Sequence, residues 1–382
     1  MHKLFNIKMK RKYYIKSFFV LFIIFPLVTI ASSLPPDTLN KKPKKNKRLK
    51  VIKLPIVMKT PETKFGVGAA MSFTFRTSIS QPDSILRTSN IQTLGLYTTR
   101  GQTIAGLDGV IYFPSENYIL RLHGSYSYFP DYFWGIGNNT PKNHMERYTY
   151  QQAYFFPQLL KRVHKNWYVG LTVEYQRLFK LVHQQNESLF ETEHVRGQNT
   201  STIPGIGGII TWDSRDNAFS STKGCFFEVS ATTFNSALLS NFTYNNFIID
   251  ARKYLKTWRG QTVAFQAYGN FNKGQVPYLS LAALGGGMIM RGYYSGRFRD
   301  NNLVAVQGEY RIPIVGRFGI VGFVAIGEVS HCLNQINFYN LKCAAGGGLR
   351  IALKKDERLN LRLDYGVARN SSGLYLLVSE AF

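Results

Sequence analysis

The feature that most constrains the fold of this chain is an alternation of apolar and polar side chains that recurs after Thr60. In Trp167–Phe179 the odd positions are mostly apolar, whereas the even positions are polar or small. Successive side chains of a β-strand point to opposite faces, so this pattern predicts strands with one apolar face. No later stretch has the spacing of an amphipathic helix. The chain is therefore expected to be all-β.

Roughly sixteen segments carry this pattern, and many of them have about ten residues or more. A tilted membrane-spanning strand needs about 9–11 residues, whereas strands of soluble proteins centre on about 5–6. No strand edge can stay unpaired in hydrocarbon, so such strands must close into a barrel. We predict a single transmembrane antiparallel β-barrel over residues 61–382. The segments are 65–78, 88–99, 102–113, 116–128, 147–159, 165–180, 200–213, 223–235, 244–257, 260–272, 277–286, 302–313, 317–329, 340–354, 358–369 and 373–382.

Residues 1–33 have the three parts of a secretory signal peptide. A stretch rich in Lys and Arg is followed by the apolar run Ser17–Ile30 and then by small residues. A membrane anchor is the alternative, but the run is short for a helical span and contains Pro26. We expect the mature chain to act outside the cytoplasm, in the outer membrane of a bacterial cell.

Basic residues are concentrated just before the predicted barrel. The formal net charge is +25, and Asn40–Lys53 contains many Lys and Arg but no acid. Such a block is typical of a solvated segment, so residues 34–60 are expected to form a disordered periplasmic tail. Anionic lipid head groups or an acidic partner are its candidate ligands. Nucleic acid is not expected, because an exported protein rarely meets it.

The last segment ends on an aromatic residue. Its alternation places Leu374, Leu376, Val378 and Phe382 on one face, with Glu380 as the exception. This ending resembles the C-terminal signal that the outer-membrane assembly machinery reads. We therefore predict that these four residues form such a signal.

Several stretches resemble motifs of the bacterial surface antigen superfamily, whose members include BamA, TamA and two-partner-secretion transporters. The resemblance spans about residues 61–382 and implies an outer-membrane barrel that assists protein or lipid insertion or translocation. The stretches are FPDYFWGIGNNT (129–140), TWDSRDNAFSSTKG (211–224), GGGMIMRGYYSG (285–296), VQGEYRIPI (306–314), LRLDYG (361–366) and the terminal EAF.

One departure from the family concerns the region before the barrel. Members with assembly or transport roles usually carry periplasmic POTRA domains there. Only about thirty residues separate the predicted signal peptide from the first predicted strand, and no POTRA domain fits. We therefore expect a compact member, whose recruiting function would fall to a separate periplasmic partner.

The hallmark loop of the family implies a role for one arginine. In the family this Arg pairs with acids on the barrel wall, which implies a loop lock formed by Arg291, Gly292, Tyr293 and Glu309. The second family acid is replaced by Ala325 here, so Arg291 is expected to rely mainly on Glu309. The lock could only hold the barrel closed, or it could also shape a seam where substrates insert.

The family turn motif covers Asp213, Arg215, Asp216, Asn217 and Gly224. Asp and Asn in such a turn mostly accept hydrogen bonds from backbone N–H groups. A structural role is therefore expected, with contact to a substrate as the alternative.

Two other function classes remain beside insertion or translocation of proteins. The chain could form a channel or a structural barrel within a larger complex. An outer-membrane enzyme is not expected, because the histidines are scattered without a nucleophile motif or metal-ligand spacing. No cofactor or metal is predicted. The three cysteines form no disulfide framework, although a Cys332–Cys343 bridge is conceivable.

Overall fold

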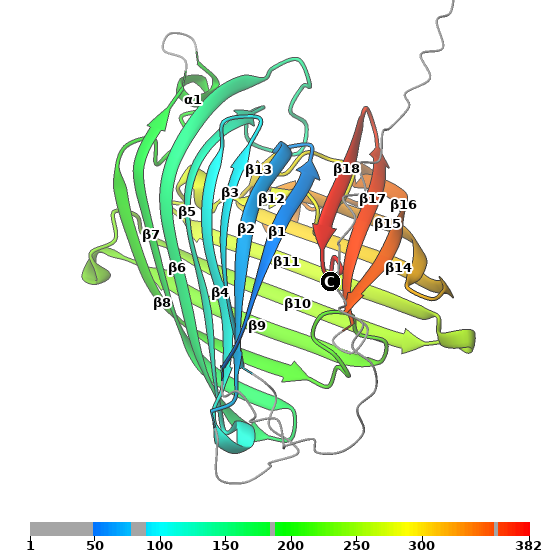
Figure 1. The fold of residues 1–382 in the computed structure, drawn as a ribbon. Helices are drawn as coiled ribbons and strands as arrows, with labels where there is room; N and C mark the ends of the chain where they lie inside the picture. The colour runs from blue at the N-terminus through cyan, green and yellow to red at the C-terminus, as the bar shows by residue number, and fades with distance from the viewer. Residues whose placement is uncertain (1–48, 78–88, 184–187, 355–357) are drawn as a thin grey trace, which may run out of the picture. The chain divides into compact units, whose positions relative to one another are not determined.

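The computed structural model describes residues 49–77, 89–183, 188–354 and 358–382. Within them sixteen antiparallel strands form a closed barrel (Figure 1). Neighbours in the barrel are neighbours in sequence, except where β11 pairs with β14 and where β1 meets β18. The strands are β1 (Leu49–Thr60), β2 (Lys64–Phe75), β3 (Ser89–Thr98), β4 (Thr103–Tyr112), β5 (Tyr118–Phe133), β6 (Glu146–His164), β7 (Trp167–Val182), β8 (Ser201–Asp213), β9 (Gly224–Phe234), β10 (Tyr244–Lys256), β11 (Thr262–Gly274), β14 (Asn302–Val315), β15 (Phe318–Ser330), β16 (Lys342–Lys354), β17 (Leu359–Ala368) and β18 (Ser371–Val378).

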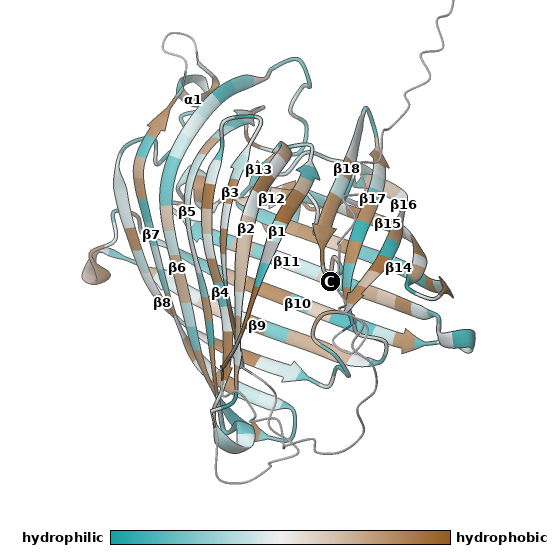
Figure 2. Cartoon of the chain, viewed as in Figure 1, coloured by the Kyte–Doolittle hydropathy of each residue, from teal (hydrophilic) through white to brown (hydrophobic). Residues whose placement is uncertain are grey.

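The predicted alternation separates an apolar outer face from a polar lumen. In β7, Leu171 and Val173 are exposed on the outside, whereas Thr172 between them is buried. In β14, Val306 is exposed while Glu309 is buried. Figure 2 shows hydrophobic and hydrophilic residues alternating along the long strands. The predicted antiparallel barrel of about sixteen strands is thus confirmed.

Two segment assignments made from the sequence are wrong. One barrel strand is missed and one segment is wrongly assigned as a barrel strand, so the predicted number of strands is still correct. Residues 49–60, expected within a disordered tail, form β1, which pairs along its whole length with β2. Residues 277–286, expected as a barrel strand, instead contain a 3₁₀ turn at Tyr278–Ser280 and the short β12 (Ala282–Leu284). The barrel therefore begins at Leu49 rather than at residue 61. The predicted signal peptide lies outside the described residues.

The connection between β11 and β14 lies in the lumen rather than on the wall. In it, β12 pairs with β13 (Phe298–Asp300) as a separate two-stranded sheet. Buried apolar residues of this connection pack against the inner face of β14–β16, where Ala325 and Ala344 lie. The segment was mistaken for a wall strand because its apolar residues contact the barrel from inside.

The connections alternate between two rims. The rim where β18 ends, called here the C-terminal rim, carries the turns 165–166, 214–223, 257–261 and 316–317. The opposite rim, called here the loop rim, carries the longer connections 134–145, 183–200 and 275–301. The helices in the described residues are single turns such as α1 (Leu189–Thr192), and none is long and apolar enough to cross a membrane.

Closure of the barrel at β1 and β18 is sparse. Lys59 opposite Leu376 is the one registered pair between these strands in the described chain. By contrast, β17 and β18 pair along a continuous register, from Leu361 opposite Val378 to Ala368 opposite Ser371. The two ribbons lie next to each other near the loop rim and diverge toward the C-terminal rim (Figure 1). We call this β1–β18 junction the seam.

Candidate functional site: the loop lock and the seam

Arg291 is the centre of the loop lock, and its side chain is 1% exposed. One guanidinium nitrogen, Nη2, donates to the Glu309 carboxylate of β14, and the other, Nη1, donates to Asp364 Oδ2 of β17 at 2.7 Å. The guanidinium also lies 3.6 Å from the centre of the Phe323 ring. The predicted contact with Glu309 is therefore present.

The expectation that Arg291 relies mainly on Glu309 is wrong. Ala325 leaves no carboxylate at the family position on β15, but Asp364 lies on β17, two strands further along the wall. Glu328, the other nearby acid, instead accepts a hydrogen bond from the Asn337 backbone N–H at 2.7 Å. The second carboxylate partner of Arg291 therefore lies on β17, and the arginine has two carboxylate partners.

Gly292 lets the loop backbone contact the wall. Its φ is +116°, and a Cβ there would lie 3.0 Å from the carbonyl carbon of Val367. The Gly292 N–H donates to the Tyr375 hydroxyl at 3.0 Å, and that hydroxyl donates to the Tyr293 carbonyl at 3.0 Å. The Tyr293 ring is buried in the cluster that joins the loop to β14–β16. All four predicted lock residues therefore meet in the structure.

Replacing Gly292 by alanine is expected to destabilise the loop by about 1–3 kcal/mol, because the side chain would be both strained and crowded. Gly322 on β15 provides the matched control, since a Cβ there would meet nothing within 4 Å. Thermal unfolding in detergent, followed by heat-modifiable migration on gels, measures the difference. Equal midpoints for the two variants would show that the close backbone contact does not matter.

The lock belongs to a larger buried charge network. Glu309 also binds Arg311 at 2.8 Å, and Asp364 also binds Arg350 at 2.5 Å and Arg362 at 3.1 Å. Each shared carboxylate thereby holds more than one guanidinium. Unpaired charges are costly away from water, so these groups depend on one another.

The network reaches the last residues of the sequence. Arg350 Nε donates to Glu380 Oε2 at 2.7 Å, and Arg311 Nη2 donates to the Phe382 carbonyl at 2.9 Å. Ser379, with a φ of 76°, turns the chain inward after β18. Phe382 is therefore buried in the lumen, beside Tyr254 and Ala264.

This inward turn corrects the expected geometry of the last segment. Val378 is exposed on the outer face, but Phe382 does not share that face with Leu374, Leu376 and Val378. The strand alternation stops at Val378, and the positive φ of Ser379 redirects the chain beyond it. The alternation of side chains does not show where the strand stops. A glycine would have indicated a positive φ, but this turn occurs at a serine.

The loop also contacts both sides of the seam. On the β18 side, Tyr375 binds the backbone of Gly292 and Tyr293. On the β1 side, Glu62 in the β1–β2 turn accepts a hydrogen bond from the Ser295 N–H at 2.6 Å. Burial raises the pKa of the Glu62 carboxyl above its ordinary value. The loop thus connects the two strands that are sparsely paired with each other.

The family turn motif has a structural role in the turn between β8 and β9. Asp216 accepts hydrogen bonds from the backbone N–H groups of Thr222 and Lys223, and it pairs with Arg358 at 2.5 Å. Burial raises the pKa of Asp216, but these donors and the Thr222 hydroxyl outweigh it, so the pKa is lowered overall.

The remaining residues of the motif complete the same turn. Asn217 Oδ1 accepts from Phe219 N and Ser220 N, and Asp213 pairs with Arg215 at 2.9 Å. Gly224 has a φ of +103°, and a Cβ there would lie 2.3 Å from the Ser214 carbonyl oxygen. These contacts agree with the structural interpretation of the motif.

Sequence reasoning missed several members of this site. Asp364 lies in the LRLDYG stretch, and its place on the polar face of an alternating strand was the available signal. Arg350 and Arg362 pair with this same Asp364 and were not assigned with it. Tyr375 and Glu62 had no local signal, because their partners are far away in sequence.

Comparisons with known proteins agree with the motifs. The model of the Omp85 superfamily domain matches residues 92–373. No curated protein matches the sequence at a significant level. Because the family model covers well over half of the chain, it establishes the family.

Solved structures show the same fold at low sequence identity. BamA from Haemophilus ducreyi, solved without POTRA domains 1–3, is 13% identical, with a TM-score of 0.56 over 87% of this chain and 70% of that one. CdiB from Escherichia coli is 12% identical, with a TM-score of 0.56 over 90% of this chain and 63% of that one. CdiB from Acinetobacter baumannii is 10% identical, with a TM-score of 0.54 over 86% and 60%.

The chain spans less than two thirds of the length of both CdiB structures. The described residues start directly with β1 and contain no α/β module of the POTRA kind. The barrel, the buried loop arginine with its two acids and the family match agree with one another. This chain belongs to the Omp85 superfamily.

Proposed function

We propose that this barrel lies in the outer membrane of a bacterium and helps client polypeptides to insert into or cross that membrane. The C-terminal rim would face the periplasm and the loop rim the cell exterior. The process would be non-covalent, without a cofactor. Client outer-membrane or secreted proteins would be the substrates, and a separate periplasmic protein would deliver them.

The sparse pairing at the seam is the observation that carries this proposal. Lys59 opposite Leu376 is the one registered pair between β1 and β18 in the described residues, and the two strands diverge from it toward the C-terminal rim. Backbone N–H and C=O groups that lack partners in hydrocarbon are costly, so an incoming strand that pairs with either edge would be stabilised. The loop lock, which contacts both sides of the seam, would set how easily it widens.

A disulfide across the seam is expected to abolish client insertion. In a chain whose three cysteines are replaced by serine, Lys59→Cys and Leu376→Cys would join the registered pair. The control pair Ser230→Cys and Ile248→Cys joins the fully registered β9 and β10. Folding of an unfolded outer-membrane protein into liposomes that contain each variant is measured by heat-modifiable migration, before and after reduction.

The expected result is a loss of client folding in the oxidised seam variant that returns on reduction, while the β9–β10 variant stays active. Equal activity of the two oxidised variants would refute the seam as the insertion site.

The C-terminal residues Leu374, Leu376, Val378 and Phe382 remain a predicted assembly signal for this barrel itself. The assembly machinery would read this signal before Phe382 is buried.

A channel is the second candidate, and a lumenal cavity of about 380 Å³ favours it. Its lining is mostly hydroxyl, amide and aromatic side chains of β5–β11, such as Ser127, Gln152 and Asn270. The connection that carries the lock occupies the lumen beside β14–β16. A channel function predicts steady conductance in planar bilayers with the lock intact, whereas an insertion function does not require it.

A further inference from the structure

The outer face of the barrel has a hollow on β8, β9, β10, β11 and β14, and it opens toward the C-terminal rim at β8–β10. One row of outward residues crosses these strands in register, namely Trp212, Phe227, Ala251, Ala267 and Val306. The two alanines in the middle of the row leave a cavity of about 430 Å³ between bulkier neighbours. Phe265 forms a further wall. We call this cavity the outer hollow.

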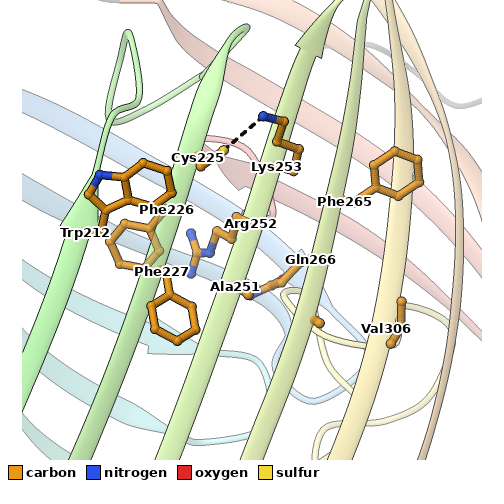
Figure 3. Close-up of a pocket in the computed structure, with 11 residues that line it drawn as sticks. Trp212, Cys225, Phe226, Phe227, Ala251, Arg252, Lys253, Phe265, Gln266 and Val306 are labelled. Carbon is orange, nitrogen blue, oxygen red and sulfur yellow. Dashed lines mark hydrogen bonds between the residues drawn. The ribbon is translucent and has the colours of Figure 1, made fainter. Parts of the chain in front are cut away.

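Figure 3 shows how the outer hollow is arranged. Phe227 and Trp212 lie on one side of Ala251, and Phe265 and Val306 lie on the other. Lys253 lies at one end, one row nearer to the C-terminal rim than Ala251. The outward side chains that line the hollow are thus mostly apolar. The ammonium group of Lys253 lies at the end of the hollow that is nearer to the C-terminal rim.

No carboxylate of the described residues pairs with the Lys253 ammonium. Its one polar contact within the described chain is the Cys225 Sγ atom, at 3.1 Å. The end of β10 adds the exposed Lys256, and the adjoining turns add the exposed Arg259 and Arg317. These turns are neighbours, since a Cβ on Gly260 would lie 3.8 Å from Pro313. Among the residues that the structure describes, none of these cations is paired with a carboxylate, so this part of the rim carries positive charge.

The depth of Lys253 in the membrane follows from the aromatic residues beside it. Trp212 stacks on Trp167 with ring centroids 6.0 Å apart, and both rings lie on the outer face close to the C-terminal rim. Tryptophan favours the level of the lipid head groups. Lys253 lies close to the end of β10 at this rim, on the same outer face, so its ammonium is expected near the level of the head groups.

We propose that the outer hollow binds one anionic phospholipid, with an acyl chain over Ala251 and Ala267 and the phosphate at Lys253. Acyl chains surround the whole outer face, so the apolar hollow alone would select no lipid. Selection would come from the cations at the rim, because basic side chains near the membrane surface attract anionic head groups. The hollow would fix the position of the lipid that these cations select.

Native mass spectrometry of the full-length barrel tests this site. The detergent-solubilised protein is titrated with phosphatidylglycerol and, separately, with phosphatidylcholine of identical acyl chains. The unsubstituted barrel is expected to retain one phosphatidylglycerol in preference to phosphatidylcholine. Lys253→Gln should reduce that preference by about fivefold, the effect expected for one basic residue near the membrane surface.

Two further variants separate the site from general effects. Lys161 lies on the outer face of β6 near the same rim, opposite Tyr118 and Val169, so Lys161→Gln should leave the preference unchanged. Ala251→Phe fills the hollow and should weaken retention of both lipids, whereas Ala105→Phe, on the outer face of β4, should not. Equal retention of the two lipids by the unsubstituted barrel, or equal effects of Lys253→Gln and Lys161→Gln, would overturn the proposal. Neither outcome depends on client insertion.

Discussion

Replacing Asp364 by asparagine is expected to cost more stability than any other single change in the network. The Asp364 carboxylate is fully buried and binds Arg291, Arg350 and Arg362 at 2.7, 2.5 and 3.1 Å. Breaking one buried ion pair usually costs about 3–5 kcal/mol, because the remaining charge is left unpaired. Here three guanidinium groups lose a shared partner, so the loss should exceed that range. Urea unfolding in detergent micelles, followed by tryptophan fluorescence, measures it.

Asp108→Asn is the matched control for this prediction. Asp108 also belongs to the barrel, but it is exposed and pairs with the exposed His123. Exposed pairs contribute about 0–1 kcal/mol. An unfolding midpoint for Asp364→Asn that equals that of Asp108→Asn would show that the buried network does not stabilise the barrel.

Replacing Arg291 by alanine is expected to release the loop from the barrel wall. Glu309 would keep Arg311, and Asp364 would keep Arg350 and Arg362, so the acids stay paired. The loop itself loses both ion pairs and the contact with Phe323, a loss of about 3–5 kcal/mol for the closed position. We expect new protease cleavage within residues 285–301 and a higher single-channel conductance in planar bilayers.

Arg291→Lys should not rescue the lock, because a single ammonium cannot bind carboxylates on two strands and stack on a ring at once. Arg259→Ala, which removes an exposed arginine from a turn at the C-terminal rim, is the control. If Arg291→Ala had the protease pattern and conductance of Arg259→Ala, the arginine would not hold the loop.

The sequence predicted the strands of the wall well and the closure of the barrel poorly. Strands such as β7 were recognised because lipid and lumen impose opposite demands on alternate residues. β1 was missed because its lysines resemble a solvated tail, although every residue of it pairs with β2. Residues 277–286 were misassigned because apolar residues that pack inside the lumen resemble those that face lipid.

Some residues of the candidate site could likewise be predicted from the sequence, and others could not. Arg291, Gly292, Tyr293 and Glu309 were found through a family motif, and the structure brings all four together. Asp364 was not assigned as a partner, since it is 73 residues from Arg291 and on a strand that does not adjoin β14. The inward turn at Ser379 was also missed, because its positive φ occurs at a residue that rarely adopts it.

The sequence by itself determined that this chain forms long strands with one apolar face, and therefore a closed barrel, since each strand carries that information in its own period of two. Only the tertiary structure decided which carboxylates hold Arg291, where the last residues lie and how β1 meets β18. Those features depend on contacts across the lumen between residues far apart in the chain. Such contacts leave no local pattern, because closure of the barrel brings the partners together.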